Sequence, residues 1–252
     1  MRITVQLHPQ HSEYADLRDA VRRAEDLGVD TVYNWDHFYP LYGDPEGKHF
    51  EAWTMLSAWA EQTTSIHIGC LVTCNTYRNP ELLADMARTV DHISGGRLVF
   101  GIGSGWFEKD HDEYGYEFGT AGSRLDNLAA TLPRIEARLG KLNPPPTRDI
   151  PILIGGGGEK KTLKLVATHA DIWHTWYHPE KPATWLHKKD VLAQWCEKVG
   201  RDMSEIELSV GGSLSPSVGD ELVGHGVAEI TIGLNGPHYD MSGVEDWLAW
   251  AR

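Results

Sequence analysis

Asp36 and His37 are the adjacent residues best suited to proton chemistry near neutral pH. They stand in an aromatic segment, with Trp35 before them and Phe38 and Tyr39 after them. A carboxylate can orient an imidazole, and an imidazole gains or loses a proton close to pH 7. An Asp-His dipeptide is by itself more often an ordinary surface pair, so its chemistry depends on where the fold places it.

Two glycine-rich segments would let a ligand approach the backbone closely. GGGG at 155–158 precedes a helix predicted to begin near Glu159, and the free N–H groups of a helix N-terminus favour an anion. This pattern predicts a phosphate-binding loop, to which Lys160 or Lys161 could add charge, although a tight turn would also use glycine. GIGSG at 101–105, followed by Trp106, lacks the spacing of a dinucleotide-binding fingerprint.

Short β-branched runs alternate with amphipathic stretches along the chain, which is typical of βα units on a parallel sheet. Strands are predicted at 2–7, 31–35, 66–72, 97–102, 152–154, 171–176, 206–210 and 228–234. Helices are predicted at 12–27, 50–62, 80–93, from about 123, from about 159, at 181–199 and at 244–252, with a short one after 210. Asn79 and Pro80 form an N-cap and a first helical residue. The segment from 103 to about 122 is predicted to be a loop.

Eight such alternations in 252 residues predict one α/β domain, residues 1–252, folded as a (β/α)8 TIM barrel with short insertions. Active sites of these barrels lie at the C-terminal ends of the strands. The Asp-His pair and both glycine-rich segments directly follow predicted strands. We therefore expect them to meet at one mouth of the barrel.

Composition narrows the class of protein. The net charge of −13 argues against nucleic-acid or anionic-membrane binding, and no apolar run approaches the ~20 residues of a membrane-spanning helix. The first residues carry no secretory signal pattern, so a cytoplasmic location is expected. Cys70, Cys74 and Cys196 are too few for a disulfide framework, and core positions are predicted for the first two.

Two hydrolase classes are disfavoured. His8 stands alone on the first strand, without a His-x-His cluster, and His174 and His178 do not converge in an extended segment, so no metal site is predicted. Ser104 lacks the spacers of a G-x-S-x-G nucleophile elbow.

Four segments together resemble the luciferase-like monooxygenase superfamily over most of the chain. They are WDHF at 35–38, LVT with YRNPELLA within 71–84, DHISGGRLVFGIGSGWFEKDHDEYG at 91–115 and IPILIGGGGEKKTLKLVATHADIW at 150–173. The string GWFEKDHDEYGY is most similar to the branch that uses the deazaflavin coenzyme F420, which is typical of actinobacteria and methanogens.

The resemblance implies an F420-dependent oxidoreductase that transfers a hydride between the deazaflavin and a small organic substrate. The alternative is an FMN-dependent luciferase-like monooxygenase, which uses reduced flavin and oxygen, and a non-catalytic binder of a flavin-like ring is a third possibility. Family members commonly dimerise, and the helix containing LLADMARTV is a candidate homodimer surface.

The resemblance also implies roles for individual residues. His37 matches a catalytic histidine that acts as an acid near the ring, and Leu71 and Val72 lie where the family has a non-prolyl cis peptide. The implied coenzyme-binding residues are Asp36, Leu71, Val72, Thr73, Ser104, Gly105, Trp106, Gly156, Gly157, Gly158, Glu159 and Lys160.

Trp106 is also a departure from the pattern. It occupies the place of the glutamate proton acceptor of the sugar-phosphate dehydrogenase relative. An aromatic residue there indicates a flatter, less polar substrate.

Overall fold

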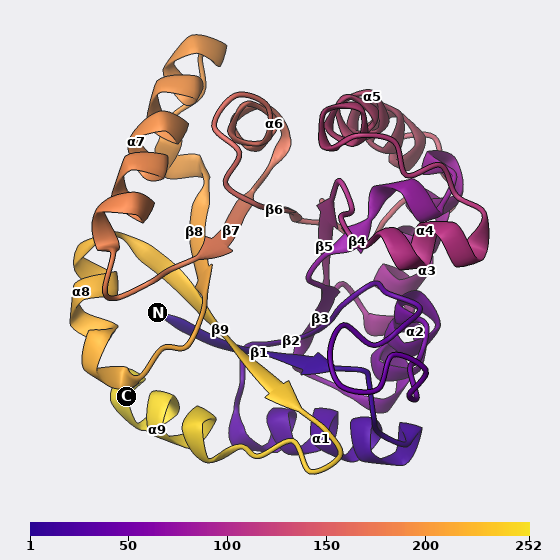
Figure 1. Cartoon of the computed structure of the whole chain (residues 1–252), viewed down its shortest axis with the longest axis vertical. Coiled ribbons are helices and arrows are strands. Elements are labelled where there is room, and N and C mark those ends of the chain that lie inside the picture. The colour runs from indigo at the N-terminus through magenta and orange to yellow at the C-terminus, as the bar shows by residue number, and fades with distance from the viewer.

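A closed barrel of parallel strands forms the centre of the molecule, and helices surround it (Figure 1). The computed structural model describes residues 1–252. The strand order is β3-β2-β1-β9-β8-β7-β6-β5-β4, and pairing of β3 with β5 closes the sheet. β3 (His67–Cys70) and β4 (Thr73–Cys74) are two parts of one barrel strand that is interrupted at Leu71 and Val72. The nine strand segments therefore make an eight-stranded barrel, as predicted.

The remaining strands are β1 (Arg2–His8), β2 (Thr31–Asn34), β5 (Leu98–Gly103), β6 (Ile152–Gly155), β7 (Ile172–Trp176), β8 (Glu207–Gly211) and β9 (Val227–Asn235). The helices are α1 (Tyr14–Leu27), α2 (Ala52–Gln62), α3 (Pro80–Ser94), α4 (Glu108–Tyr114), α5 (Ala121–Leu139), α6 (Thr162–His169), α7 (Pro182–Val199), α8 (Gly219–Gly224) and α9 (Ser242–Ala251).

The structure departs from the predicted elements in two places near the barrel mouth. α4 forms where a loop was expected, because seven residues are too few to show an apolar period, and Gly115 ends the helix in the left-handed conformation. α6 begins at Thr162 and not near Glu159, because residues 159–161 form a turn. The predicted N-cap of α3 is confirmed, since the Asn79 side chain accepts a hydrogen bond from the backbone N–H of Leu82 at 3.1 Å.

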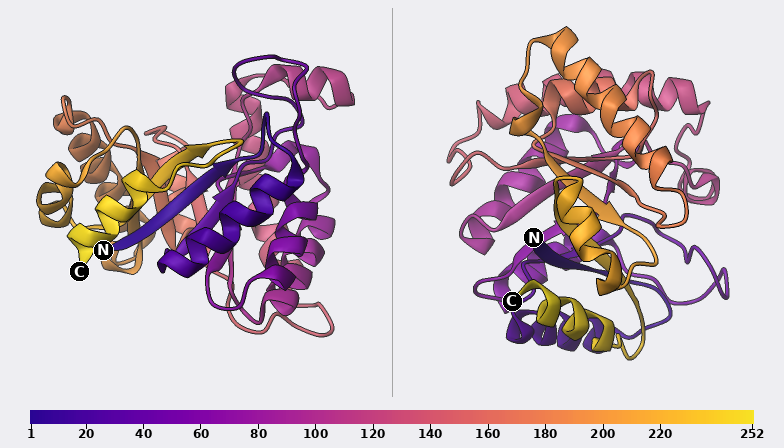
Figure 2. Two further views of the ribbon diagram at one scale, coloured as in Figure 1. Left: turned by 90° about the horizontal axis from the view of Figure 1, so that it is seen from below. Right: turned by 90° about the vertical axis from the view of Figure 1, so that its left-hand side faces the viewer.

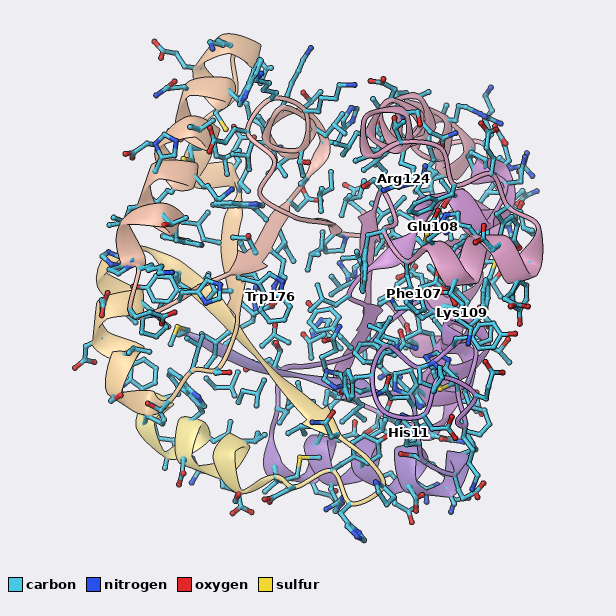
Figure 3. All side chains as sticks on the ribbon, in the orientation of Figure 1. His11, Phe107, Glu108, Lys109, Arg124 and Trp176 are labelled. Carbon is cyan, nitrogen blue, oxygen red and sulfur yellow. The ribbon has the colours of Figure 1, made fainter.

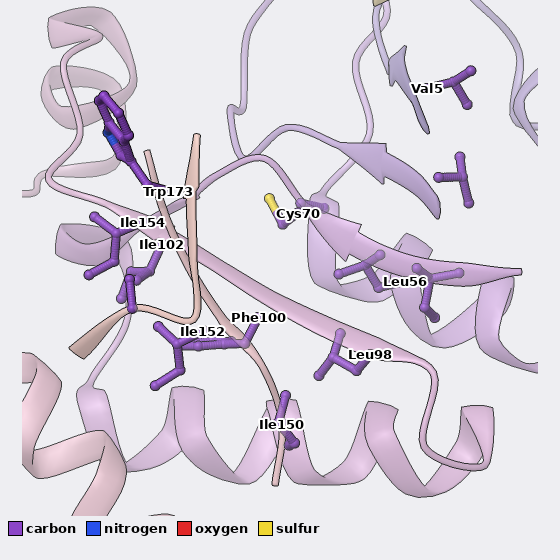
Figure 4. Close-up of a cluster of buried hydrophobic side chains, with 14 of the residues drawn as sticks. Val5, Leu56, Cys70, Leu98, Phe100, Ile102, Ile150, Ile152, Ile154 and Trp173 are labelled. Carbon is purple, nitrogen blue, oxygen red and sulfur yellow. The ribbon is translucent and has the colours of Figure 1, made fainter. Parts of the chain in front are cut away.

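The hydrophobic core lies between the barrel and its ring of helices, and Figure 4 shows one part of it around Phe100 and Trp173. Helix α1 places its apolar side chains at three- and four-residue spacing, which turns them all toward the barrel. Packing accounts for six of the ten tryptophans, which are buried: Trp35, Trp53, Trp59, Trp173, Trp185 and Trp247. The count of ten therefore reflects the core more than the site.

Other predictions about the chain can be checked directly. Cys70 and Cys74 are free and buried, as expected of core residues, and so is Cys196. None of the helices has the length and apolar character needed to cross a membrane. The loop between β2 and α2 stands beside α4 above one mouth of the barrel (Figure 2), where Lys109 of α4 donates hydrogen bonds to Pro45 O and to Glu46. These two segments enclose the site described next.

Candidate active site

A cavity of about 1080 Å³ opens at the C-terminal ends of the barrel strands. Every barrel strand contributes residues at or just beyond its end, so the predicted meeting of the strand ends is observed. Figure 3 shows Trp176 of β7 and Phe107, beside α4, on opposite sides of the opening. The volume is at the upper limit of typical small-molecule sites and suits a multi-ring ligand together with a second small molecule.

The cavity brings together most of the predicted site residues. Those that line it are Asp36, His37, Leu71, Val72, Thr73, Ser104, Gly105, Trp106 and Gly156. Four others do not: Gly157, Gly158, Glu159 and Lys160 lie in the turn that leads away from the cavity to α6. This turn is mostly exposed, because α6 begins three residues later than expected.

His37 is held by a carboxylate that the sequence did not single out. Nδ1 of His37 lies 2.8 Å from Oδ2 of Asp110, and Oδ2 also accepts a hydrogen bond from the Tyr77 hydroxyl. The other oxygen of Asp110 accepts the backbone N–H groups of Phe38 and Tyr39, both at 3.1 Å. Asp110 is fully buried and acts only as an acceptor when ionised, so the Nδ1 proton of His37 is directed to it and Nε2 is left for a ligand.

Asp36 lies beside the cavity but its oxygens are already engaged. Arg78 grips the carboxylate with two bonds, at 2.5 Å to Oδ2 and 2.9 Å to Oδ1, and the backbone N–H of Cys74 donates at 2.9 Å. Arg78 also bonds Glu51, the N-cap of α2, at 2.5 Å. The Asp36–Arg78 pair therefore fixes the end of η1 (Asn75–Tyr77), and the bond from Cys74 fixes β4, against the end of β2.

The peptide bond between Leu71 and Val72 is cis, within the pair of residues predicted for this feature. The Leu71 carbonyl accepts a hydrogen bond from the Gln6 side chain at 2.5 Å. Val72 projects among glycines of neighbouring strands: a Cβ at Gly103 would lie 2.7 Å from Val72 Cγ2, and one at Gly155 would lie 3.1 Å from Cγ1. Because Gly103 of β5 and Gly155 of β6 have no side chains, there is room for Val72.

Two polar groups at the strand ends differ in their hydrogen bonding: the Thr73 hydroxyl has no partner, whereas the Gly105 carbonyl has one. Oγ1 of Thr73 is buried and has no hydrogen-bond partner, although Thr73 lines the cavity. Gly105, at φ +78°, has its carbonyl bonded by Nε of Arg124 at 3.0 Å, and a Cβ there would lie 2.5 Å from Cys74 Sγ. Unpaired buried hydroxyls are uncommon, so Thr73 is a natural contact for a bound polar group.

The glycine-rich loop after β6 gains its positive charge from a residue far away in the sequence. Gly156 has φ +117°, a conformation open mainly to glycine, and its carbonyl accepts the Trp173 indole N–H at 2.8 Å. Nζ of Lys188, on α7, lies 2.5 Å from the Gly157 carbonyl. Lys161 instead pairs with Asp126 on α5. Lys188 is therefore a cation at this loop that the sequence analysis missed.

Large aromatic side chains stand exposed at the cavity rim. Trp106 is 62% exposed and Trp176 is 65% exposed, and both line the cavity. The ring of Trp106 also lies edge-on to His37, with 5.6 Å between ring centroids. A substrate that entered would therefore meet flat apolar surfaces before it reached His37.

The structure is an eight-stranded parallel barrel with a cavity at its strand ends and a glycine-rich loop on one side of that cavity. This arrangement is that of a coenzyme-binding barrel enzyme. The family model of the luciferase-like monooxygenases matches residues 1–245, and the chain belongs to this family. This confirms the family expected from the sequence motifs.

Individual relatives match only part of the chain. An uncharacterized protein of Mycobacterium tuberculosis is 26% identical over 185 residues, which cover 62% of this chain and 66% of that protein. An F420-dependent glucose-6-phosphate dehydrogenase of Amycolatopsis mediterranei is 39% identical over 93 residues, or 36% of this chain and 27% of the enzyme. The matches thus span less than two thirds of these relatives.

Among solved structures, an F420-dependent secondary alcohol dehydrogenase in complex with an F420-acetone adduct is similar over nearly the whole fold. It covers 98% of this chain and 97% of its own length, with a TM-score of 0.84 and 17% sequence identity. At that identity the likeness establishes the shared fold.

Proposed function

We propose that this protein is an F420-dependent oxidoreductase that transfers a hydride between the deazaflavin and a small organic substrate. The observation that carries the proposal is the single cavity onto which the oriented His37, the Leu71–Val72 turn of the third barrel strand and the glycine-rich loop all open. F420-dependent enzymes among the sequence relatives support the choice of coenzyme.

The residues present fit such a coenzyme. Gly156, directly after β6, lines the cavity with backbone alone and so allows close approach, and Lys188 supplies positive charge beside the loop for an anionic tail. Thr73 offers an unpaired hydroxyl, and the backbone around Leu71 and Val72 would support the ring. Asp36 would act by holding this segment in place through Arg78. When bound, the deazaflavin would supply the hydride chemistry at its ring carbon C5.

His37 has the arrangement of a residue that holds a proton at one defined atom. Because Asp110 takes the Nδ1 proton, the imidazole presents Nε2 toward the cavity. Phe107 and Trp106 lie edge-on to the ring and limit the access of water. His37 would therefore deliver or accept a proton near the coenzyme ring.

The substrate class follows from the rim of the cavity. Trp106 and Trp176 line the same cavity, at a rim where the family resemblance implied an acidic proton acceptor in place of Trp106. Two exposed indoles favour stacking on a flat, weakly polar molecule. We therefore expect a planar, weakly polar substrate.

The test is a titration of the purified chain with F420 and, separately, with FMN, each oxidised and reduced. Tighter binding of F420 than of FMN is expected. Gly156→Ala should weaken F420 binding at least tenfold, because the residue has a φ that alanine adopts poorly and lies in the cavity wall.

Gly28→Ala is the matched control. Gly28 also has positive φ, +84°, but ends α1 on the outside of the barrel, so the change should lower stability and leave F420 binding intact. Equal or tighter binding of FMN would refute the choice of coenzyme, and equal effects of the two substitutions would refute the role of the loop.

A further inference from the structure

A chain of hydrogen-bonded side chains crosses three strands inside the barrel. Nδ1 of His174, on β7, lies 2.8 Å from Oγ of Ser209 on β8. Ser209 in turn donates to Oε1 of Glu229 on β9, also at 2.8 Å. The strand register places these residues directly beside one another. His174 lines the cavity described above but has been given no role in it, and it was considered in the sequence only as a metal ligand.

Which group donates in each of these hydrogen bonds follows from the protons that each side chain carries. Glu229 pairs with Arg2 at 3.2 Å, so its carboxylate accepts the hydroxyl proton of Ser209. Ser209 has no second proton and must therefore accept from Nδ1–H of His174. Burial lowers the pKa of His174 to about 4, so the ring is neutral at pH 7 and Nε2 carries a free lone pair.

Nε2 of His174 is available on the cavity side. His174 lines the cavity, and Nε2 has no hydrogen-bond partner in the protein. A Cβ on Gly211, another lining residue, would lie only 3.2 Å from Nε2. The glycine thus leaves this nitrogen uncovered, whereas any side chain at position 211 would crowd it.

The other end of the chain leads toward the opposite mouth of the barrel. Glu229 is 1% exposed, and burial raises its pKa, with Arg2 acting in the opposite direction. The Tyr33 hydroxyl lies 3.4 Å from the same carboxylate. Arg2 is partly exposed and also pairs with Glu207 at the start of β8, which reaches solvent. These are the charged and titratable groups that face the chain.

We propose that Nε2 of His174 exchanges a proton with the hydroxyl of an alcohol substrate, or with the oxygen of the corresponding carbonyl, and that Ser209 and Glu229 carry this proton onward. In the oxidising direction the substrate O–H breaks and N–H forms at Nε2, the Nδ1 proton passes to Ser209, and the Ser209 proton passes to Glu229. The net result is one proton moved from the substrate to the Glu229 carboxylate and no electrons, since the hydride is handled by the coenzyme of the proposed function, on which this inference rests.

The assignment gives the cavity a proton acceptor beside its aromatic rim. Trp106 and Trp176 offer no basic atom, and His174 provides a neutral acceptor from β7. His37 would remain with the coenzyme ring and His174 with the substrate. His174 is then a catalytic residue, and Ser209 and Glu229 act through it: they fix its tautomer at rest and take up its Nδ1 proton during the reaction.

The first test needs neither coenzyme nor substrate. Nitrogen-15 NMR of the histidine rings, with His174 assigned by loss of its signals in His174→Gln, should show a neutral ring protonated at Nδ1 at pH 7. Ser209→Ala should abolish this tautomer preference, Ser209→Thr should keep it, and Thr4→Val, which removes another buried barrel hydroxyl, should not affect it. A ring protonated at Nε2 in the unsubstituted protein would overturn the proposal.

The second test follows oxidation of benzyl alcohol and 1-phenylethanol with oxidised F420 across pH. Ser209→Ala should lower kcat at least tenfold, leave KM within about twofold and change the pH profile, while Ser209→Thr and Thr4→Val resemble the unsubstituted protein. Suppose that the protein binds F420 but Ser209→Ala and Thr4→Val have equal kcat, or that neither alcohol is oxidised. Either result would overturn the role of His174 and leave the proposed coenzyme in place. Absence of F420 binding would instead overturn the proposed function.

Discussion

Nδ1 of His37 lies 2.8 Å from Oδ2 of Asp110, across 73 positions of sequence and within a fully buried contact. The carboxylate fixes the tautomer of the imidazole by accepting its Nδ1 proton. An amide at position 110 would offer a donor on the same side and favour the opposite tautomer.

Asp110→Asn is therefore expected to lower kcat by roughly 10²- to 10⁴-fold, the usual range for a positioned acid–base group, with little change in KM. Steady-state kinetics with F420 will check this, and circular dichroism will show whether the fold is retained. Glu108→Gln, at an exposed site on the same helix, is the control and should leave kcat unchanged. A kcat of Asp110→Asn within twofold of the control would contradict the role of Asp110.

Asp36→Asn should lower both the free energy of unfolding and the affinity for F420. The change leaves the buried Arg78 with Glu51 as its one remaining carboxylate, and breaking a buried ion pair costs about 3 kcal/mol. Urea unfolding and F420 titration measure the two effects. Arg134→Gln breaks the exposed pair with Glu81 and should change stability far less, because solvent screens that pair. Equal losses in the two variants would refute the structural role of the Asp36–Arg78 pair.

Thr73→Val should lower the affinity for F420 without lowering the free energy of unfolding. Oγ1 of Thr73 has no partner in the protein, so replacing it with a methyl group should leave the free energy of unfolding unchanged or raise it. If the hydroxyl contacts the coenzyme, F420 affinity should fall about fivefold to tenfold, as expected for one hydrogen bond of about 1 kcal/mol. Unchanged affinity would remove Thr73 from the coenzyme site.

Stability should fall as the solution is acidified, in part because of His174. Its pKa of about 4 in the folded protein lies below the ordinary value of 6.5, so the unfolded chain binds the proton first as pH falls. The stabilising effect of the neutral ring is complete above pH 6.5 and declines toward pH 4. At pH 5 the loss from this residue amounts to about 2 kcal/mol.

Urea unfolding of the unsubstituted protein and of His174→Gln at pH 7, 6 and 5 checks this prediction. The difference between their unfolding free energies should shrink with acidification, because only the unsubstituted protein contains the titrating ring. Burial also lowers the pKa of His49, to about 4, and that contribution is common to both proteins. A difference that is constant across these pH values would show that His174 does not titrate as described.

The sequence predicted the barrel well because its signals are local. Alternating β-branched runs mark strands, and caps such as Asn79 mark helix starts, so strand ends and the residues after them could be assigned without a structure. That sufficed to bring Asp36, His37, Thr73, Ser104 and Gly156 to one cavity.

The supporting residues could not be found in this way because they come from distant segments. Asp110 lies on a short helix that looked like a loop, and Lys188 is 31 positions from the carbonyl it bonds. His174 and Ser209 are 35 positions apart and meet only through the register of β7 and β8. A sequence period indicates which face a residue occupies, but not which loop folds over the mouth or which side chain completes a hydrogen-bonded pair.

Because Val72 packs among glycines, a substitution at this one residue can change the depth of the cavity. Because Gly103 and Gly155 border the same side chain, the depth of the cavity at this point is governed by one residue and not by three. Trimming Val72 to alanine would deepen the chamber without touching the backbone of β5 or β6. Adding methyl groups to the glycines would instead collide with Val72, so attempts to alter ligand size should begin from the valine.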